Sequence, residues 1–433
     1  MDDTIRTILY SWIDKKLPTI ITREIPLETY LNIQPKKIIV ITGFRRVGKT
    51  YSLLQLLSNL LKTSHREQEV YINFDDERIP QHTEFLTMII PTMKQTFKKE
   101  TKHLFLDEIQ NMPQWGNWLR RIYDNEDFGI FVTGSSSKVS SREIPTELRG
   151  RCLEIKVFPL SLREFLRFKG KKIDEKTVSY SEHQHTELMK SFEEYLLNGG
   201  MPEVVLASDD KKREILQQYY GTVVQRDIIE RNNVNNEEGL KAMLRLLLNS
   251  TSYSISRLYD TLKSLKYEIG KTTIQHYISY VENSYFIYSI PIFSYKVKDQ
   301  LQYPRKVYFI DNGFITSLST RHSENYGRLY ENLTAIELLR KQTQDNTNLF
   351  YWKDKRGNEV DFIIKDDLKV KQLIQVCYDV EYYDTKKREI NALLKASEEL
   401  KCKDLLILTK DYEQIEEIKG KKIRFLPLYK WLL

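Results

Sequence analysis

The sequence predicts an α/β protein in which a parallel sheet with helices on both faces is followed by a helical segment and a small α/β domain. Five short apolar runs alternate with longer amphipathic stretches between residues 37 and 158. Strands and helices that alternate in this way form parallel sheets covered on both faces. The chain is mostly helical in character between 160 and 290, and an α/β pattern returns from about 325.

The five expected strands are short and mostly apolar. They are KIIVIT (37–42), EVYINF (69–74), HLFLDE (103–108), GIFVTG (129–134) and CLEIKVF (152–158). The stretches YSLLQLLSNLLK and WGNWLRRIYDN between them repeat apolar residues at the spacing of a helix. We place this first domain at residues 1–170.

Two further domains are expected after the first. The segment HTELMKSFEEYLLNGG ends in a glycine pair that is typical of a helix stop. Residues 239–293 follow the order helix, helix, tight glycine turn, helix and β-ribbon, which predicts a winged helix-turn-helix within a domain at 171–320. Residues 321–433 then form a compact α/β domain with several strands and the charged helix TKKREINALLKASEELK.

Net charge and the spacing of the cysteines indicate which partners, metal sites and cellular compartment to expect. The 433 residues carry a net charge of +7, which suits an anionic partner such as nucleic acid without requiring one. Cys152, Cys377 and Cys402 are far apart, so we expect neither a disulfide framework nor a zinc module, and a reducing cytoplasm. The N-terminus carries acids where a signal peptide carries bases, and no apolar run approaches the roughly 18 residues that cross a bilayer. We therefore expect a cytoplasmic protein without membrane contact.

The segment from Gly43 to Thr50 matches the phosphate-binding pattern G-x-x-x-x-G-K-T, with the strand before it and the helix after it that the pattern requires. Backbone N–H groups would surround phosphate oxygens, Lys49 would reach the β and γ phosphates of ATP, and Thr50 would ligate Mg²⁺. No general P-loop role requires Arg45 or Arg46, so these two face either a partner or solvent. The expected nucleotide-binding residues are Gly43, Phe44, Arg45, Arg46, Val47, Gly48, Lys49, Thr50 and Tyr51.

An acidic pair, Asp107 and Glu108, ends the strand HLFLDE. The carboxyl ends of neighbouring parallel strands meet at one edge of a sheet, so this pair is expected beside the P-loop. Asp107 then suits the Mg²⁺ shell, and Glu108 suits a base that polarises the attacking water. General acid-base chemistry without a metal is the lesser interpretation of the pair.

Two later motifs supply further candidates for the same site. The strand GIFVTG is followed by Ser135 and Ser136, so Thr133 and these serines either orient the attacking water, sense the γ phosphate or form a plain Ser/Gly turn. Arg149 and Arg151 in ELRGR form either surface salt bridges or an arginine finger that acts on a neighbouring subunit.

Taken together, these motifs resemble those of AAA-type archaeal and bacterial ATPases. The matching segments are GFRRVGKT, LDEIQ, TGSSS, LRGR and FPLSLREF, in this order. YLLNGGMPEVV, QRDIIER, VYFIDNGF and YENLTAIELL resemble the C-terminal region that accompanies this ATPase module. The resemblance implies an ATP-hydrolysing module, a winged-helix segment and a restriction-endonuclease-like C-terminal fold.

Metal-dependent cleavage in such a nuclease fold needs an Asp at one strand end, a Glu-x-Lys on the next strand and often an acid on a preceding helix. The chain offers Glu331 and Asp361, but Gln375 and Cys377 stand where Glu-x-Lys is expected. An amide brings no charge to Mg²⁺, and a thiol does not replace an ammonium group. We therefore expect a catalytically degenerate domain, kept for binding or assembly, in which Cys377 is a small buried side chain rather than a redox or metal thiol.

The sequence thus favours a Mg-dependent ATPase that couples ATP hydrolysis to DNA binding or remodelling. The expected recognition helix TTIQHYISYVEN has almost no positive charge, which leaves a second hypothesis open. In that hypothesis the chain is an ATP-controlled switch that binds a protein partner and does not act on DNA. The candidate partners are ATP with Mg²⁺, DNA, and further copies of the same chain.

Overall fold

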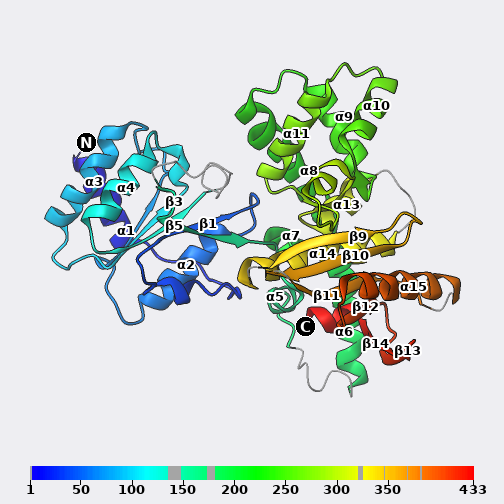
Figure 1. Cartoon of the computed structure of the whole chain (residues 1–433). Helices are drawn as coiled ribbons and strands as arrows, with labels where there is room; N and C mark the ends of the chain where they lie inside the picture. Colours follow the sequence, from blue (N-terminus) through cyan, green and yellow to red (C-terminus); the bar gives the residue numbers. More distant parts are fainter. Residues whose placement is uncertain are drawn as a thin grey trace. The chain divides into compact units, whose positions relative to one another are not determined.

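The computed structural model describes residues 2–134, 148–172, 181–319, 325–345, 347–367, 369–380 and 383–433. The chain divides into two compact units, residues 1–157 and 158–433 (Figure 1). Residues after 157 belong to the second unit because α5 (Leu162–Phe168) packs against α6 (Glu182–Asn198) and α7 (Pro202–Leu206). The division into three domains, with boundaries after residues 170 and 320, stays a prediction.

The first unit contains one five-stranded sheet in which every strand pair is parallel. The strand order is β2-β3-β4-β1-β5, so the P-loop strand has neighbours on both sides. This confirms the predicted strands and their direction. The strands are β1 (Ile38–Gly43), β2 (Glu69–Asn73), β3 (His103–Asp107), β4 (Gly129–Thr133) and β5 (Cys152–Val157).

Helices cover both faces of this sheet, as predicted. The connection through α2 runs from β1 to the edge strand β2, whereas the connections through α3 and α4 run in the opposite direction, back toward β1. Because crossovers between parallel strands are right-handed, α2 lies on the opposite face of the sheet from α3 and α4 (Figure 1). The helical segments of the first unit are α1 (Asp2–Asp14), η1 (Leu27–Tyr30), α2 (Lys49–Leu60), α3 (Thr83–Thr96), η2 (Ile109–Asn111) and α4 (Trp115–Asn125).

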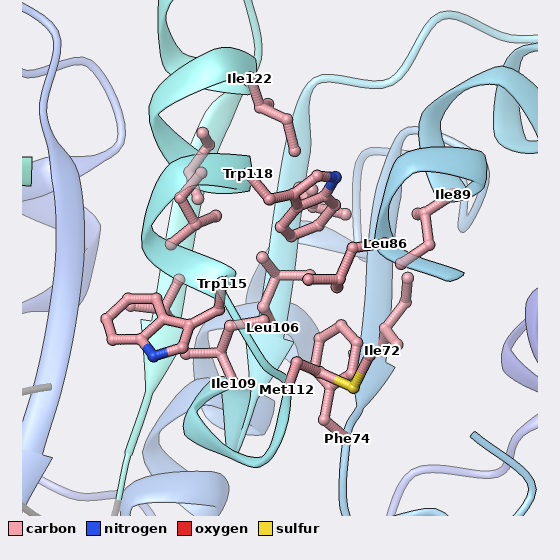
Figure 2. Packing of buried hydrophobic residues seen from close by; sticks show 14 of the residues in the cluster. Ile72, Phe74, Leu86, Ile89, Leu106, Ile109, Met112, Trp115, Trp118 and Ile122 are labelled. Atoms are coloured by element: carbon pink, nitrogen blue, oxygen red, sulfur yellow. The ribbon is translucent and has the colours of Figure 1, made fainter. Parts of the chain in front are cut away.

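A large apolar cluster fixes α1, α3 and α4 on their face of the sheet. In Figure 2, Leu86 and Ile89 of α3 and Trp118 and Ile122 of α4 point toward one another over the strands. On the sheet's other face, the rings of Phe105 and Phe131 stack with centroids 5.1 Å apart. Side chains that alternate between two buried faces explain why these strands are almost continuously apolar.

The second unit begins with helices and a small antiparallel sheet. That sheet has the strand order β6-β8-β7. After α5, α6 and α7, its elements are α8 (Asp209–Thr222), η5 (Val223–Glu230), α9 (Glu237–Leu248), β6 (Ser252–Tyr253), α10 (Ile255–Ser264), α11 (Lys271–Asn283), β7 (Ile287–Ile290), α12 (Val297–Gln302), β8 (Arg305–Phe309), α13 (Asn312–Leu318) and α14 (Tyr326–Asp345).

A six-stranded mixed sheet completes the second unit. Its strand order is β13-β14-β12-β11-β10-β9, and β12 pairs in parallel with both of its neighbours while the outer pairs are antiparallel. The elements are β9 (Asn348–Lys353), β10 (Glu359–Asp366), β11 (Lys369–Val376), α15 (Tyr383–Leu400), β12 (Leu405–Thr409), β13 (Gln414–Ile418), β14 (Lys421–Pro427) and α16 (Leu428–Leu432).

A buried polar network joins three motifs of the second unit. The Asp311 carboxylate accepts hydrogen bonds from the backbone N–H of Gly200 at 2.6 Å and of Gly313 at 2.8 Å. The Asn332 side chain pairs with both backbone groups of Phe309 and donates to the Asn312 amide oxygen at 2.9 Å. The NGG, DNG and ENL segments are therefore held together by hydrogen bonds, which gives these motifs a structural role.

Within the ranges described above, no helix combines the length and the apolar character needed to cross a membrane.

Candidate nucleotide site and a carboxylate cluster

The P-loop connects the end of β1 to the start of α2, and both of its glycines have backbone angles that suit glycine. Gly43 has a φ of +142°, and a Cβ built on it would lie 2.3 Å from the carbonyl oxygen of Val157. Gly48 has a φ of +99° in the position before α2. Any side chain at Gly43 would therefore push the loop away from β5.

Two buried side chains hold the P-loop against the core, and one residue of the loop has a strained backbone conformation. The side chains of Phe44 and Val47 are fully buried. Arg46 is exposed and has a φ of +64°, in the left-handed region that non-glycine residues rarely adopt. Arg45 is half-buried, and Tyr51 is exposed on the first turn of α2. Strain of this kind persists only where the surroundings enforce it, and it is typical of ligand-binding loops.

Lys49 lies over the loop, although it is the first residue of α2. Its ammonium group donates to the carbonyl oxygens of Gly43 and Phe44, both at 3.1 Å, and the residue is buried. The positive end of the α2 dipole adds to this charge. Positive charge of this kind favours an anion, and the phosphate-binding role of the loop stays a prediction.

Asp107 receives hydroxyl groups from three different elements. Thr50 of α2 donates to its carboxylate at 3.1 Å, Tyr71 of β2 donates at 2.9 Å, and Thr133 of β4 donates as well. Burial raises the pKa of Asp107, and the hydrogen bonds from Thr133, Tyr71 and Thr50 oppose that rise. A carboxylate and a hydroxyl held together at the edge of the P-loop are oxygen donors that suit Mg²⁺.

Glu108 follows directly and also has strained backbone angles, with φ +53° and ψ +42°. Its backbone N–H donates to the Thr133 hydroxyl at 3.0 Å, and its carboxylate accepts from the Gln110 side chain. Because the Thr133 hydroxyl also donates to Asp107, one side chain fixes both members of the acidic pair. Thr133 therefore positions the Asp107 carboxylate and the Glu108 backbone. Ser135 and Ser136, predicted at the same edge, lie outside the described residues.

Arg23 supports the P-loop from a distant part of the sequence. Its side chain is 5% exposed and donates from Nη1 to the Val47 carbonyl oxygen at 3.0 Å. The Gln55 side chain of α2 pairs with both backbone groups of Arg23, at 2.7 and 3.1 Å. Sequence analysis missed this residue because a single arginine in a segment without strand or helix periodicity carries no recognisable signal.

The two candidate finger arginines lie at the other end of the sheet. The backbone carbonyl of Arg151 accepts from Ile38, the first residue of β1, whereas the P-loop follows the last residue of this strand. Six residues of strand span roughly 20 Å, so neither Arg151 nor Arg149 reaches the P-loop of its own chain. Arg151 forms an ion pair with Asp124 at 3.5 Å and lies over the Tyr123 ring, and Arg149 is exposed.

In the second unit, a buried ammonium group lies between Glu331 and Asp361, two of the positions predicted for a degenerate nuclease site. Lys306 of β8 donates to Asp361 at 2.7 Å and lies 2.9 Å from both Glu331 and Glu359. Tyr308 adds a hydroxyl that donates to Glu331 at 2.7 Å. Burial disfavours the charged lysine, but the carboxylates hold the pKa of Lys306 well above its ordinary value. Glu331 and Asp361 are predicted from the sequence, whereas Lys306 and Glu359 are not.

Gln375 and Cys377 have structural partners beside this cluster. The Gln375 amide accepts from the backbone N–H of Asp361 at 3.2 Å and donates to Glu389 at 2.6 Å. Cys377 is buried, and burial raises the pKa of its thiol to about 12, so it stays protonated. In the part of the chain that the structure describes, no group of three His, Cys, Asp or Glu side chains is arranged to hold a metal ion.

Comparison with known proteins agrees with the geometry of the first unit. A family model described as an AAA domain matches residues 35–166, and two models described as domains of unknown function, DUF8612 and DUF4143, match residues 189–325 and 326–431. The uncharacterized protein MJ1544 of Methanocaldococcus jannaschii is 38% identical, over 96% of this chain and 92% of its own length. The chain belongs to this family of AAA-domain proteins.

Other relatives of this AAA-domain protein extend the comparison. An uncharacterized protein of Haemophilus influenzae is 28% identical over 95% of this chain and 98% of its own length. Among solved structures, the Walker-type ATPase PABY2304 of Pyrococcus abyssi aligns with 15% identity and a TM-score of 0.46, over 67% of this chain and 93% of that one. The family predicted from the motifs, an AAA-type P-loop ATPase family, is confirmed by the matching AAA domain.

Proposed function

We propose that this AAA-domain protein is a Mg-dependent ATP hydrolase. The observation that carries the proposal is the hydrogen bond of 3.1 Å between Thr50 and Asp107, which brings the end of the P-loop and the acidic strand end together. Thr50 and Asp107 would hold Mg²⁺, and Lys49 would bind the terminal phosphates. The metal would neutralise charge on the β and γ phosphate oxygens.

Glu108 is the proposed base of the reaction. Its carboxylate directly follows the residue that would hold the metal, and its backbone is fixed by Thr133. A carboxylate in this position polarises the water that attacks the γ phosphate. A P-loop used only for binding would need no such group.

We further propose that hydrolysis is coupled to DNA binding through a winged helix formed by α9, α10, α11 and the sheet β6-β8-β7. The support is the element order, helix, short strand, two helices and two longer strands, with β6 pairing to the last strand. The alternative, an ATP-controlled switch that binds a protein, is favoured by one observation. Between residues 271 and 283, α11 carries a single lysine and no arginine. A helix that reads a DNA groove normally gains much of its affinity from basic contacts to phosphate.

A turnover assay on the full chain tests both parts of the proposal. ATP hydrolysis would be measured with Mg²⁺ alone and then with duplex, junction and single-stranded DNA at low salt. Hydrolysis that requires Mg²⁺ and is lost in Lys49→Ala supports the ATPase, and a rate that changes with DNA supports the coupling. If no DNA bound to the protein or altered its turnover, the coupling would be abandoned in favour of the protein-binding switch. Scattering curves that do not change with ATP would then count against the switch.

A further inference from the structure

Residues 294–305, which follow β7 and end at the first residue of β8, display several apolar side chains to solvent, and we call them the wing segment. Tyr295 is 80% exposed, Val297 68%, Leu301 69% and Tyr303 51%. α12 lies within this segment and has no buried residue. Clustered exposed apolar side chains mark a binding surface on soluble proteins.

The wing segment holds a defined shape through internal hydrogen bonds. Ser294 donates from its hydroxyl to Asp299 at 2.8 Å and accepts from the backbone N–H of Lys296 at 3.1 Å. Gln300 donates to the Ser294 carbonyl oxygen at 2.7 Å. The exposed side chains therefore project from a folded turn, so ordering them on a ligand costs less entropy than ordering a loose chain.

A cavity of about 620 Å³ is lined by the wing segment, α11 and residues 253–256 at the junction of β6 and α10. This volume is within the range of roughly 300–1,000 Å³ that is typical of small-molecule pockets. Polar groups line much of it: Gln275, Ser279 and Glu282 come from α11, and Gln302, Tyr303 and Arg305 come from the wing segment and β8. These side chains offer both donors and acceptors, which is the set that hydrogen-bonds the edge of a nucleobase.

The charges of the wing segment favour an anionic chain. Lys296 and Lys298 are exposed and alternate with Tyr295 and Val297. The single acidic residue of the segment, Asp299, is engaged by Ser294. Aromatic rings interleaved with basic side chains are the combination that binds single-stranded nucleic acid, because the rings stack on bases while the cations follow the phosphates.

An unpaired strand fits this surface better than a duplex. Gln275, Ser279 and Glu282 of α11 line the cavity beside the wing segment, so the polar groups of this helix are directed to a hollow. A base inside a duplex cannot enter a cavity, whereas an unpaired base can be stacked on a tyrosine and read on its edge. We propose that the wing segment and its cavity bind single-stranded nucleic acid, with one base entering the cavity beside Tyr303 and others stacking on Tyr295. This inference rests on the proposed coupling to DNA and names the form of nucleic acid involved.

Binding of fluorescent oligothymidine to the full chain, compared with a duplex of equal length, tests the proposal. The wild type should bind the single strand more tightly, and Tyr295→Ala with Tyr303→Ala should lower that affinity by about tenfold or more. Tyr295→Phe with Tyr303→Phe should retain the affinity, because phenylalanine keeps the stacking surface. Tyr383→Ala, which removes a 72% exposed tyrosine of α15, is the matched control. Lys296→Gln with Lys298→Gln should reduce the salt dependence of binding.

The outcomes separate this inference from the proposed ATPase. Turnover without nucleic acid should be the same in the wild type and in both tyrosine double variants, since the nucleotide-site residues belong to the first unit and the wing segment to the second. Absence of hydrolysis in every form would refute the proposed function and leave the binding result intact. Equal oligothymidine affinity in the wild type and the alanine double variant would overturn the inference, as would binding to duplex alone. Failure of the wild type to bind any nucleic acid would also overturn it and favour a protein partner.

Discussion

The Lys306 ammonium lies 2.7 Å from the Asp361 carboxylate, at a point where Glu331 and Glu359 also converge. One buried cation thus neutralises a cluster of acids that includes Glu331 and Asp361, the two carboxylates predicted for a nuclease fold. Lys306 comes from β8 and Asp361 from β10, so the contact also ties the three-stranded sheet to the six-stranded sheet within the second unit.

Replacing Lys306 with methionine should strongly destabilise the second unit. The change leaves buried carboxylates without a counter-charge, and breaking a buried ion pair on one side costs about 3–5 kcal/mol. Urea unfolding of Lys306→Met and wild type measures the difference, and Lys403→Met at an exposed position is the control. Equal midpoints for Lys306→Met and wild type would show that the cluster contributes no net stability.

We also expect the wild type to cleave no DNA in Mg²⁺ or Mn²⁺, because the ammonium occupies the centre of the acids.

The P-loop site could be predicted from the sequence, whereas the Lys306 cluster could not. The P-loop is a continuous eight-residue pattern, and Asp107 could be placed beside it because parallel strands end at one edge. Lys306, Glu331 and Glu359 lie on three different elements, and their meeting depends on strand register and helix packing. From sequence alone, a lysine near the start of a strand is expected to be exposed to solvent, and only the position of the neighbouring sheet shows that it is buried. Arg23 was missed for the same reason, since only the folded chain brings it under Val47.

Glu108→Gln should bind ATP with nearly wild-type affinity and hydrolyse it at least about a hundredfold more slowly. The amide keeps the size of the side chain but cannot polarise water as a base, and general-base catalysis contributes roughly 10²–10⁴ in rate. Single-turnover hydrolysis and binding of a fluorescent ATP analogue separate the two effects. Lys49→Ala should instead lose binding, and Glu100→Gln at an exposed position should change neither. Unchanged turnover in Glu108→Gln would remove the residue from its proposed role.

Arg23→Met should weaken ATP binding by about tenfold, because it removes the hydrogen bond that holds the Val47 carbonyl in the P-loop. A hydrogen bond that involves a charged group contributes about 1.5–3 kcal/mol. Arg23→Lys, which keeps a cationic donor, should restore part of the affinity. Arg121→Met changes an exposed arginine of α4 and serves as the control. The dissociation constant is the readout, with circular dichroism as a check on folding. A fully folded Arg23→Met chain with unaltered affinity would contradict the positioning role.

Turnover per chain should rise with protein concentration if Arg149 acts on the nucleotide site of a neighbouring copy. The reason is geometric: Arg149 lies at the far end of its own sheet and is exposed, whereas Arg151 is engaged by Asp124 and Tyr123. Arg149→Ala should abolish the rise without changing stability, and Arg151→Ala should mainly lower the unfolding midpoint. Turnover per chain that is independent of concentration, with Arg149→Ala equal to wild type, would rule out a finger in trans.

The pH dependence of stability should report the buried carboxyl of Asp311. Burial raises the pKa of Asp311 from 3.8 to about 7, and the N–H donors of Gly200 and Gly313 only partly offset this rise. The folded chain then holds the proton more tightly than the unfolded chain. The resulting stabilisation is complete below about pH 4 and is lost as the pH rises through 7.

Asp311→Asn is neutral at every pH and should remove this dependence. The unfolding free energy of wild type relative to Asp311→Asn should therefore fall between pH 4 and pH 8, by about 4 kcal/mol as an upper bound. Parallel urea titrations of both chains at several pH values measure this difference, and Asp260→Asn at an exposed position is the control. The contrary result is an unfolding free energy of wild type, relative to Asp311→Asn, that rises with pH between 2 and 4. The backbone donors of Gly200 and Gly313 would then outweigh the effect of burial and stabilise Asp311 in its charged form.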